Sequence, residues 1–298
     1  MKLISACRSL VTVGVWPLLS VLAASGCATK PEEVIAPVFN TADPIAVSAI
    51  RERAIQTIQN MAADADPQRR ANAVEAASLA PTRLARVVQQ GVTDVNPAVR
   101  TVAAMTIARA KLTALCDQTR PLLDDPSPHV RTAAIYALAA CGAEVDRSPL
   151  ATALLDDPSP RVRSQVAFIL GELGDPSAIP LLRTSARERM SAATPEQLKL
   201  LELQVAEALI KLGMDSQRPV IRAALYPSRP DELEAAALAA QIIGEVNDWE
   251  AMYQLMNLAD YRDSAGQKYP AEVRLAIAAS LASMGSKRAA TTSCSASP

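Results

Sequence analysis

The stretch DPSPHVR, residues 125–131, decides how this chain folds, because close variants of it recur along the sequence. DPSPRVR occupies residues 157–163, DVNPAVR occupies residues 94–100, and DADPQRR occupies residues 64–70. In each copy an aspartate stands six residues before an arginine, and successive arginines are 30, 31 and 32 residues apart. A period of this length is typical of a repeat array in which each repeat is one supersecondary unit.

Each copy lies between two segments that are rich in alanine and leucine, such as 149–155 before one copy and 132–140 after another. We expect the aspartate to end a first helix and the proline to begin a second, where its missing N–H costs nothing. Ser127 and Ser159 precede two of these prolines and are favoured N-cap residues. Each unit is therefore predicted to be a helix, a tight turn and a second helix.

The composition agrees with helices. Half of the 298 residues are hydrophobic, but only 3% are aromatic, which favours helix over a strand-rich sandwich. The net charge of −1 argues against nucleic-acid binding, because little basic surplus is present to neutralise phosphates. His129 is the only histidine; we expect it to be a solvated ring in a turn, and we expect no metal and no cofactor.

With these motifs the chain resembles the HEAT-repeat family, in the short bacterial variety also called PBS-lyase HEAT-like, over residues 45–285. The resemblance implies an all-α fold, a right-handed α-solenoid of about seven HEAT-like helix pairs whose second helices line a concave surface. The units are expected at 45–80, 81–110, 112–142, 148–174, 176–213, 214–246 and 247–285. Residues 286–298 are polar and small, and they are expected to be a disordered tail.

In this family the aspartates and arginines of the repeated phrase link adjacent units through a hydrogen-bonded ladder along the turns. The resemblance assigns that structural role to Asp64, Arg70, Asp94, Arg100, Asp125, Arg131, Asp157 and Arg163. A pair that occurs in every copy is expected to be structural, because a catalytic pair occurs once; no catalytic residue is predicted. Glu234 departs from the pattern, since it stands where the sixth unit should carry an arginine.

Residues 1–26 have the three parts of a cleaved signal peptide: the basic Lys2 and Arg8, an apolar run over 10–22, and small residues over 23–26. The apolar run is shorter than the ~20 residues that a transmembrane helix needs.

Residues 24–27, ASGC, resemble the lipobox of bacterial lipoproteins, although Ala24 stands where leucine is usual. The resemblance implies that Cys27 carries acyl chains such as palmitate and that residues 27–44 form an extended tether. The protein is then exported and membrane-anchored, and the lack of an aspartate after Cys27 implies the outer membrane, facing the periplasm, in a Gram-negative host. The alternative is ordinary secretion with a free Cys27 thiol.

Two cysteines lie in the repeat region. Cys116 is near the start of the third unit's first helix and Cys141 near the end of its second, and in an antiparallel pair these ends are neighbours. An exported protein can oxidise such a pair, so Cys116 and Cys141 are a candidate disulfide, and two separate buried thiols are the alternative.

Two connections between first and second helices are longer than the others, at about 184–195 and 260–270. We expect them to project from the same edge of the solenoid on either side of the sixth unit. Their candidate partner-binding residues are Arg187, Arg189, Tyr261, Arg262 and Tyr269. Neutral drift in surface loops is the alternative. Trp249 and Tyr253 are four residues apart on one helix and are expected in the core.

These features predict a membrane-tethered scaffold lipoprotein that binds an unidentified protein or peptide in the bacterial cell envelope, without catalysis. One alternative is a lyase-like or cofactor-handling enzyme of the PBS-lyase HEAT-like type. Another is a purely structural assembly lipoprotein. One HEAT-like enzyme family hydroxylates a modified lysine with iron held by repeated His-Glu pairs, and this chain contains no such pair. A deep concave pocket with convergent polar groups would favour an enzyme, and an open groove a binding protein.

Overall fold

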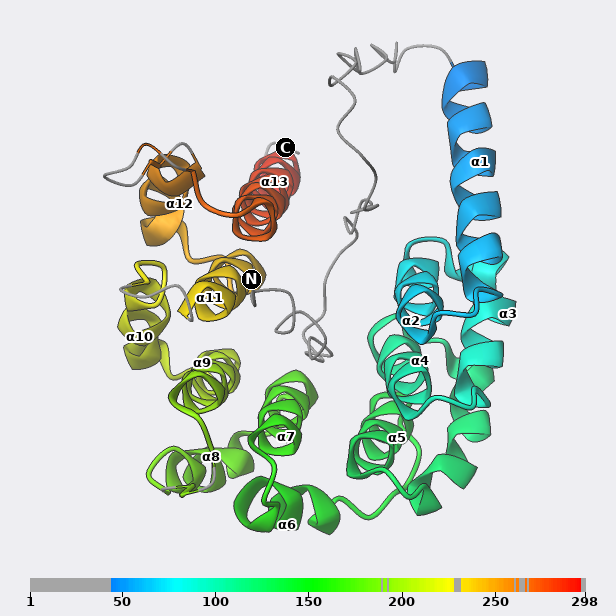
Figure 1. Ribbon diagram of the computed structural model, residues 1–298, viewed down its shortest axis with the longest axis horizontal. Helices are drawn as coiled ribbons and strands as arrows, with labels where there is room; N and C mark the ends of the chain where they lie inside the picture. Colours follow the sequence, from blue (N-terminus) through cyan, green and yellow to red (C-terminus); the bar gives the residue numbers. More distant parts are fainter. Residues whose placement is uncertain are drawn as a thin grey trace, which may run out of the picture.

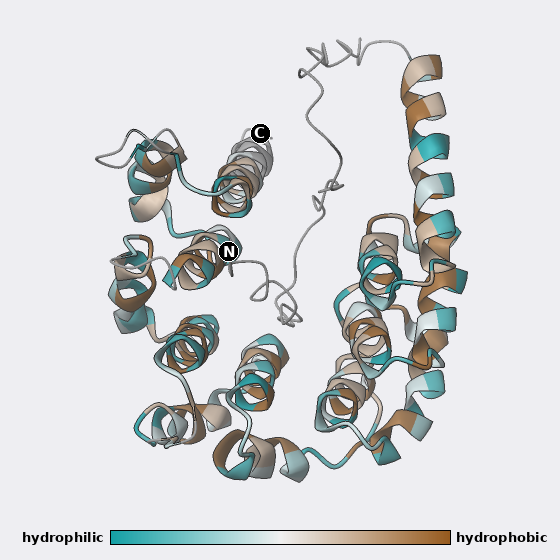
Figure 2. Ribbon diagram, viewed as in Figure 1, coloured by the Kyte–Doolittle hydropathy of each residue, from teal (hydrophilic) through white to brown (hydrophobic). Residues whose placement is uncertain are grey.

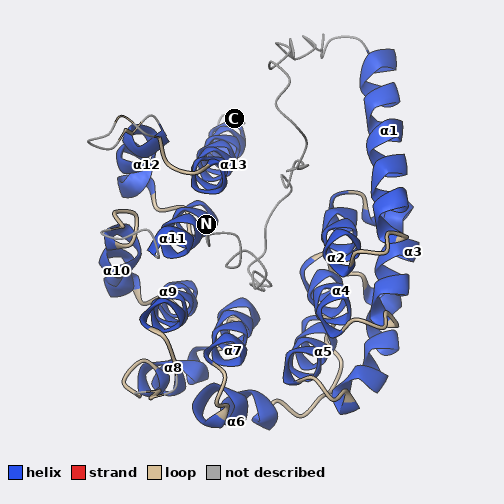
Figure 3. Cartoon of the chain, in the orientation of Figure 1, coloured by secondary structure: helices blue, strands red, loops and turns tan. Residues whose placement is uncertain are grey.

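The computed structural model describes residues 44–188, 190–191, 193–227, 232–259, 261–262, 266 and 268–295. The signal peptide, Cys27, most of the predicted tether and Arg189 lie outside these residues. The described helices form an arch (Figure 1), and Figure 3 shows helices and loops in this part of the chain without a strand. The predicted all-α solenoid is confirmed.

The first elements of the seven units are α1 (Pro44–Ala62), α3 (Pro81–Val92), η2 (Thr113–Asp124), α6 (Ser148–Asp156), α8 (Ile179–Ser185), α10 (Arg218–Ala223) and α12 (Met252–Ala259). The second helices are α2 (Pro67–Ala76), α4 (Pro97–Arg109), α5 (Pro128–Ala140), α7 (Pro160–Leu173), α9 (Pro195–Lys211), α11 (Leu233–Glu245) and α13 (Ala271–Ser295). Short 3₁₀ turns are η1 (Ala77–Leu79), η3 (Pro176–Ala178), η4 (Asp215–Gln217) and η6 (Trp249–Ala251).

The two sets of helices form two layers. The second helices line the inside of the arch and the first elements lie outside them, as the family resemblance implies (Figure 1). Most helices carry both apolar and polar residues (Figure 2). The apolar side chains form two clusters, one from Ile55 to Leu209 and one from Leu203 to Met284, and α9 contributes to both. Each unit thus buries its apolar side chains against its neighbours, as expected of a solenoid.

The repeated aspartate stabilises each tight turn. The carboxylates of Asp64, Asp94, Asp125 and Asp157 each accept the backbone N–H two residues further on, at 2.8–2.9 Å. Ser127 and Ser159 occupy the N-cap positions of α5 and α7, but their hydroxyls accept no helix N–H. The predicted N-cap positions of the two serines are confirmed, but the side chain that orders each turn is the aspartate two residues earlier, which accepts the serine N–H.

Two elements differ from expectation. The third unit begins with the 3₁₀ element η2, whose internal Pro121 supplies no N–H donor. α13 runs to Ser295, so helical backbone continues ten residues past the boundary at 285, where a disordered tail is predicted. Extending an existing helix costs little, because each added residue gains one hydrogen bond.

Close helix packing occurs at Gly171 of α7. A Cβ atom at Gly171 would lie 2.7 Å from the Cα of Ala208 on α9, so a larger residue would force the two helices apart. Within the described residues no helix is long and apolar enough to cross a membrane.

Candidate functional site

Arg70 and Arg100 each join their own turn to the next unit. Arg70 Nε and Nη2 donate to the two carboxylate oxygens of Asp94 at 2.7 and 2.8 Å, and Arg100 donates to Asp125 at 2.8 and 3.1 Å. The Nη1 of each arginine donates to two backbone carbonyls of its own turn. The hydrogen bond from Arg70 lowers the pKa of Asp94. In each pair the arginine and aspartate charges are matched, and the arginine also binds backbone carbonyls of its own turn. The role of these residues is therefore structural.

The ladder is interrupted at Arg131. Its Nη1 donates to the carbonyls of Asp125 and Pro126 at 2.7 and 2.9 Å, but within the described residues Arg131 makes no ion pair. The carboxylate of Asp157 accepts the N–H of Ser159 instead. An ionic link from Arg131 to the fourth unit, which the repeat pattern implies, is therefore absent.

A different polar contact joins the third and fourth units. Gln165 of α7 is buried; its Nε2 donates to the carbonyl of His129 at 2.8 Å and to the hydroxyl of Thr132 at 2.9 Å. Gln165 Oε1 lies 2.6 Å from the Nδ1 of His129. The expectation of a solvated His129 is wrong, because this ring packs against the next unit's helix.

Later links in the ladder use residues that the repeat phrase does not contain. Arg163 donates to Glu188 at 2.7 Å, so the connection after α8 supplies the carboxylate. Arg222 of α10 donates to the buried Asp248 at 2.7 and 2.5 Å. In these pairs and the two earlier ones, the acid follows the arginine by 24–26 residues. This spacing between arginine and acid is the sequence signal that could have identified Glu188, Arg222 and Asp248 as members of the ladder.

The two kinds of ladder arginine predict different stabilities for their variants. Arg100→Ala is expected to lower the free energy of unfolding by about 1–3 kcal/mol, because it leaves the poorly exposed carboxylate of Asp125 without its partner. Arg131→Ala removes only hydrogen bonds to carbonyls and is expected to cost about 1 kcal/mol. Urea denaturation of both variants measures the difference. Equal losses would contradict the interrupted ladder.

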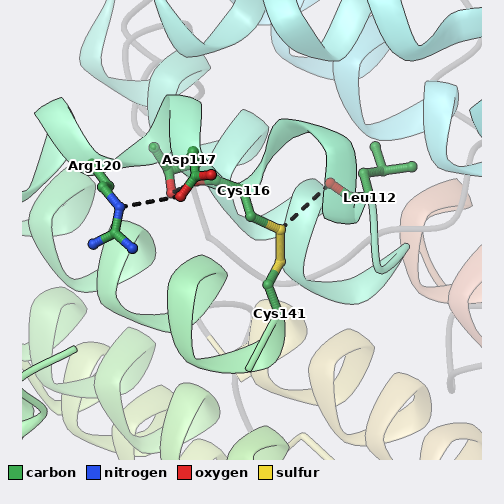
Figure 4. The surroundings of a disulfide bond; sticks show 6 residues. Leu112, Cys116, Asp117, Arg120 and Cys141 are labelled. Carbon is green, nitrogen blue, oxygen red and sulfur yellow. Dashed lines mark hydrogen bonds and ion pairs between the residues drawn. A yellow bond between two sulfur atoms is a disulfide. The ribbon is translucent and has the colours of Figure 1, made fainter. Parts of the chain in front are cut away.

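Cys116 of η2 and Cys141, the C-cap of α5, form a disulfide, with Cα atoms 6.4 Å apart (Figure 4). The Sγ of Cys116 also lies 3.5 Å from the carbonyl oxygen of Leu112 (Figure 4). The bond connects the two elements of the third unit at the end opposite to their turn, where an antiparallel pair brings these residues together.

A second set of charges lies where the C-terminal ends of several second helices converge. We call Arg109, Glu172, Glu207, Lys211 and Glu245 the central charge cluster. Lys211 Nζ lies 2.6 Å from Glu172, 2.5 Å from Glu207 and 3.4 Å from Glu245. Arg109 of α4 lies 3.5 Å from Glu245 of α11. This contact joins residues 136 positions apart, and sequence reasoning missed the whole cluster.

Two aromatic side chains, Phe168 and Tyr136, contact this cluster. Arg109 and Lys211 lie 5.8 and 4.9 Å from the ring centre of Phe168, and the hydroxyl of Tyr136 donates to Glu172 at 3.2 Å. Contacts of cations with an aromatic face are favourable, more so away from water. Burial and the carboxylate of Glu172 raise the pKa of Tyr136, so the phenol stays protonated.

The charges of the cluster shift one another's pKa values. Burial raises the pKa of Glu207 from its ordinary 4.5 to about 7, although Lys211 opposes this shift. Burial acts against the ammonium of Lys211, but the three surrounding carboxylates outweigh it and raise its pKa. A cavity of about 510 Å³ opens beside the cluster, between α4, α5 and α7. Within the described residues no group of His, Cys, Asp and Glu side chains is arranged to hold a metal ion.

The sixth and seventh units carry exposed aromatic side chains on their outer helices. Tyr253 is 73% exposed and Trp249 is 37% exposed, so the expectation that both are core residues is wrong. Leu255 and Leu258 take the inward face of α12, which leaves Tyr253 outside. We call the exposed set Tyr226, Trp249, Tyr253, Met256 and Tyr261 the aromatic surface.

The connection from α12 to α13 is tied together by its own contacts. The rings of Tyr261 and Tyr269 lie 5.2 Å apart, and Arg262 donates to the carbonyl of Gly266 at 2.9 Å. Arg262 and Lys268 form an isolated antiparallel bridge. Tyr269 is near Tyr226 as well as Tyr261, and burial raises its pKa. The structure thus places Arg262 and Tyr269 next to Tyr261, which belongs to the aromatic surface.

The other predicted connection is only partly available for binding. Arg187 is exposed, whereas the neighbouring Glu188 is held by Arg163. Arg189 lies outside the described residues. Figure 1 shows α8, α10 and α12 in one outer row.

Comparison with known proteins gives one family match. A model described as HEAT repeats matches residues 84–157 and 147–240, which together span more than half of the chain. No curated protein matches it.

Several solved structures are distantly similar. Human deoxyhypusine hydroxylase in complex with glycerol is 18% identical over 81% of this chain and 89% of its own, with a TM-score of 0.39. Two engineered proteins are 16% and 15% identical, cover 81% and 78% of this chain and 71% and 97% of their own, and each have a TM-score of 0.29. These likenesses are too distant to bear on function.

Proposed function

This chain belongs to the HEAT-repeat family, and we propose that it is a non-catalytic scaffold that binds a protein or peptide in the bacterial cell envelope. The observation that carries the proposal is the aromatic surface. In a chain with 3% aromatic residues, four of its seven tyrosines and tryptophans are exposed in the last two units. Tyrosine, tryptophan and methionine are enriched at protein interfaces relative to other surfaces.

The charge distribution supports the same interpretation. The sequence of α12, MYQLMNLA, contains no charged residue, and its outward side chains include Tyr253 and Met256. Arg262 and Lys268 belong to the connection that follows α12. Interfaces commonly have such an arrangement, with few charges at the centre and polar residues at the rim. Arg262 and Tyr269, whose ring lies 5.2 Å from that of Tyr261, add to this surface within the seventh unit.

We propose no catalysis because the ionisable groups of the central charge cluster bind one another. The carboxylates of the central charge cluster bind Lys211 and Arg109, and Tyr136 donates to one of them. Groups engaged in this way suit a structural connection between helices more than proton transfer. The proposal therefore assigns no catalytic residue and no cofactor to this chain.

A photo-crosslinking amino acid at position 253 tests partner binding in intact cells. We expect it to capture a defined protein, because Tyr253 is the most exposed residue of the aromatic surface. The same amino acid at position 95 is the matched control, since Val95 is 90% exposed but lies in the turn of the second unit. Capture at 253 should disappear in a Met256→Ser background with an unchanged thermal melt. Identical products from positions 95 and 253 would contradict the proposal.

We also propose that lipid on Cys27 tethers the scaffold to the membrane. Cys27→Ser is expected to release the protein into the soluble fraction or to leave an unprocessed precursor, because acyl chains cannot attach to serine in this reaction. Cys294→Ser, at the other end of the chain, should leave fractionation unchanged. Membrane fractionation and the mass of the mature N-terminus measure both results. A normally processed Cys27→Ser protein that stays with membranes would disprove the anchor.

A further inference from the structure

The cavity beside the central charge cluster has a distinct chemistry of its own. It is lined by alanine side chains from α4 and α5, by the ring of Tyr136, and by three cationic residues, Arg109, Lys111 and Arg147. Its volume of about 510 Å³ falls within the range of small-molecule pockets. It lies at the C-terminal ends of α4, α5 and α7, beside the longer connection that leads from α5 to α6.

Two of the three cations form no ion pair with the described residues. Arg109 is paired with Glu245, and Glu172, the one carboxylate that lines the cavity, is bound by Lys211 and Tyr136. Within the described residues no ion pair involves Lys111 or Arg147. The cavity wall therefore carries two cations that form no ion pair within the described residues, although the charges of Arg147 and Asp175 interact.

The backbone at Lys111 provides an independent observation. Lys111 has a φ of 50°, in the left-handed region, directly after α4 ends. The corresponding positions after α5, α7 and α9 are Gly142, Gly174 and Gly213, with φ values of 79°, 69° and 93°. Glycine adopts this conformation without the steric cost that a lysine incurs. The backbone conformation at residue 111 favours glycine, so it does not account for a lysine there. The position of Lys111 in the cavity wall does account for it.

We propose that this cavity binds a small organic anion, with Lys111 and Arg147 as contacts to its carboxylate or phosphate group and the alanines and Tyr136 around its apolar part. The site lies among second helices, away from the aromatic surface on the outer helices, so it is independent of the proposed partner-binding function. Cations at helix C-termini can also compensate the helix dipole, which would require no ligand. Anion titration and thermal melts of variants distinguish anion binding from compensation of the helix dipole.

Calorimetric titration of the full-length protein with citrate, and separately with inorganic phosphate, tests the site at constant ionic strength. We expect saturable binding of at least one probe, and the stronger arm identifies the anionic group. Lys111→Gly and Arg147→Gln are each expected to weaken it about tenfold, as loss of a charge-assisted hydrogen bond does. Asn247→Gly is the matched control, because Asn247 has a φ of 49° after α11 but does not line the cavity.

Thermal melts of the same proteins give the second readout. Lys111→Gly is expected to raise the melting midpoint by about 1–3 °C through relief of backbone strain, while its anion affinity is weakened. A lowered midpoint for Lys111→Gly with unchanged anion affinity would show helix-dipole compensation and overturn the proposal. Absence of saturable binding by either probe to the wild-type protein would overturn it as well.

Discussion

Replacing Lys211 by methionine is expected to lower the free energy of unfolding by about 3–5 kcal/mol at pH 8, the range observed when one partner of a buried ion pair is removed. Lys211 contacts Glu172, Glu207 and Glu245, which come from three successive second helices. Methionine keeps most of the side-chain volume but leaves these carboxylates facing one another. Their repulsion acts directly on the packing of α7, α9 and α11.

The cost of Lys211→Met should depend on pH. The pKa of Glu207 is raised from 4.5 to about 7 in the folded protein. The folded state therefore binds more protons than the unfolded state between these values, and the contribution of Glu207 to stability is present below pH 4.5 and lost as the pH rises to 7. Without Lys211 the carboxylates gain protons more readily, so the variant is expected to lose less stability at pH 5 than at pH 8.

Urea denaturation at pH 5 and pH 8 measures this effect. Lys199→Met is the matched control, because Lys199 pairs with the exposed Glu202 and should contribute less than about 1 kcal/mol at either pH. A Lys211→Met protein as stable as the wild type at pH 8, or destabilised equally at both pH values, would show that the central charge cluster does not connect these helices.

Reduction of the Cys116–Cys141 disulfide is the second large effect that we expect. The bond closes a loop with a sequence separation of 25 residues, which corresponds to about 3.5 kcal/mol in the loop-entropy model. It also attaches the 3₁₀ element η2 to α5, and the hydrogen-bond geometry of such elements is poorer than that of an α-helix.

Thermal melts with and without reductant measure the contribution of the disulfide. Cys141→Ser should melt at the temperature of the reduced wild type, and reductant should leave the melt of this variant unchanged. Thiol titration of the denatured protein checks the premise. An unreduced sample with the same thiol count as a reduced one would show that the bond does not form.

Most of the architecture was predictable from local sequence signals. The Asp–Pro–Arg phrase repeats every 30–32 residues, and the chemistry that ends and begins a helix acts within a few residues. Hence the seven units and the tight turns follow from the sequence. The candidate disulfide likewise required only the antiparallel arrangement of one helix pair. Trp249 and Tyr253 show the limit, because their spacing places them on one helix without indicating which side faces the neighbouring unit.

The sequence by itself determined the repeat and the helix pairs, because these depend on contacts between residues that are near in the chain. Only the tertiary structure decided which links join the units: Arg131 forms no ion pair within the part of the chain that the structure describes, Gln165 binds His129, and Arg109 reaches Glu245 136 residues away. The physical reason is that helix tilt accumulates from one unit to the next. The places where helix ends converge on a charge cluster or separate around a cavity then depend on the packing of all units between them.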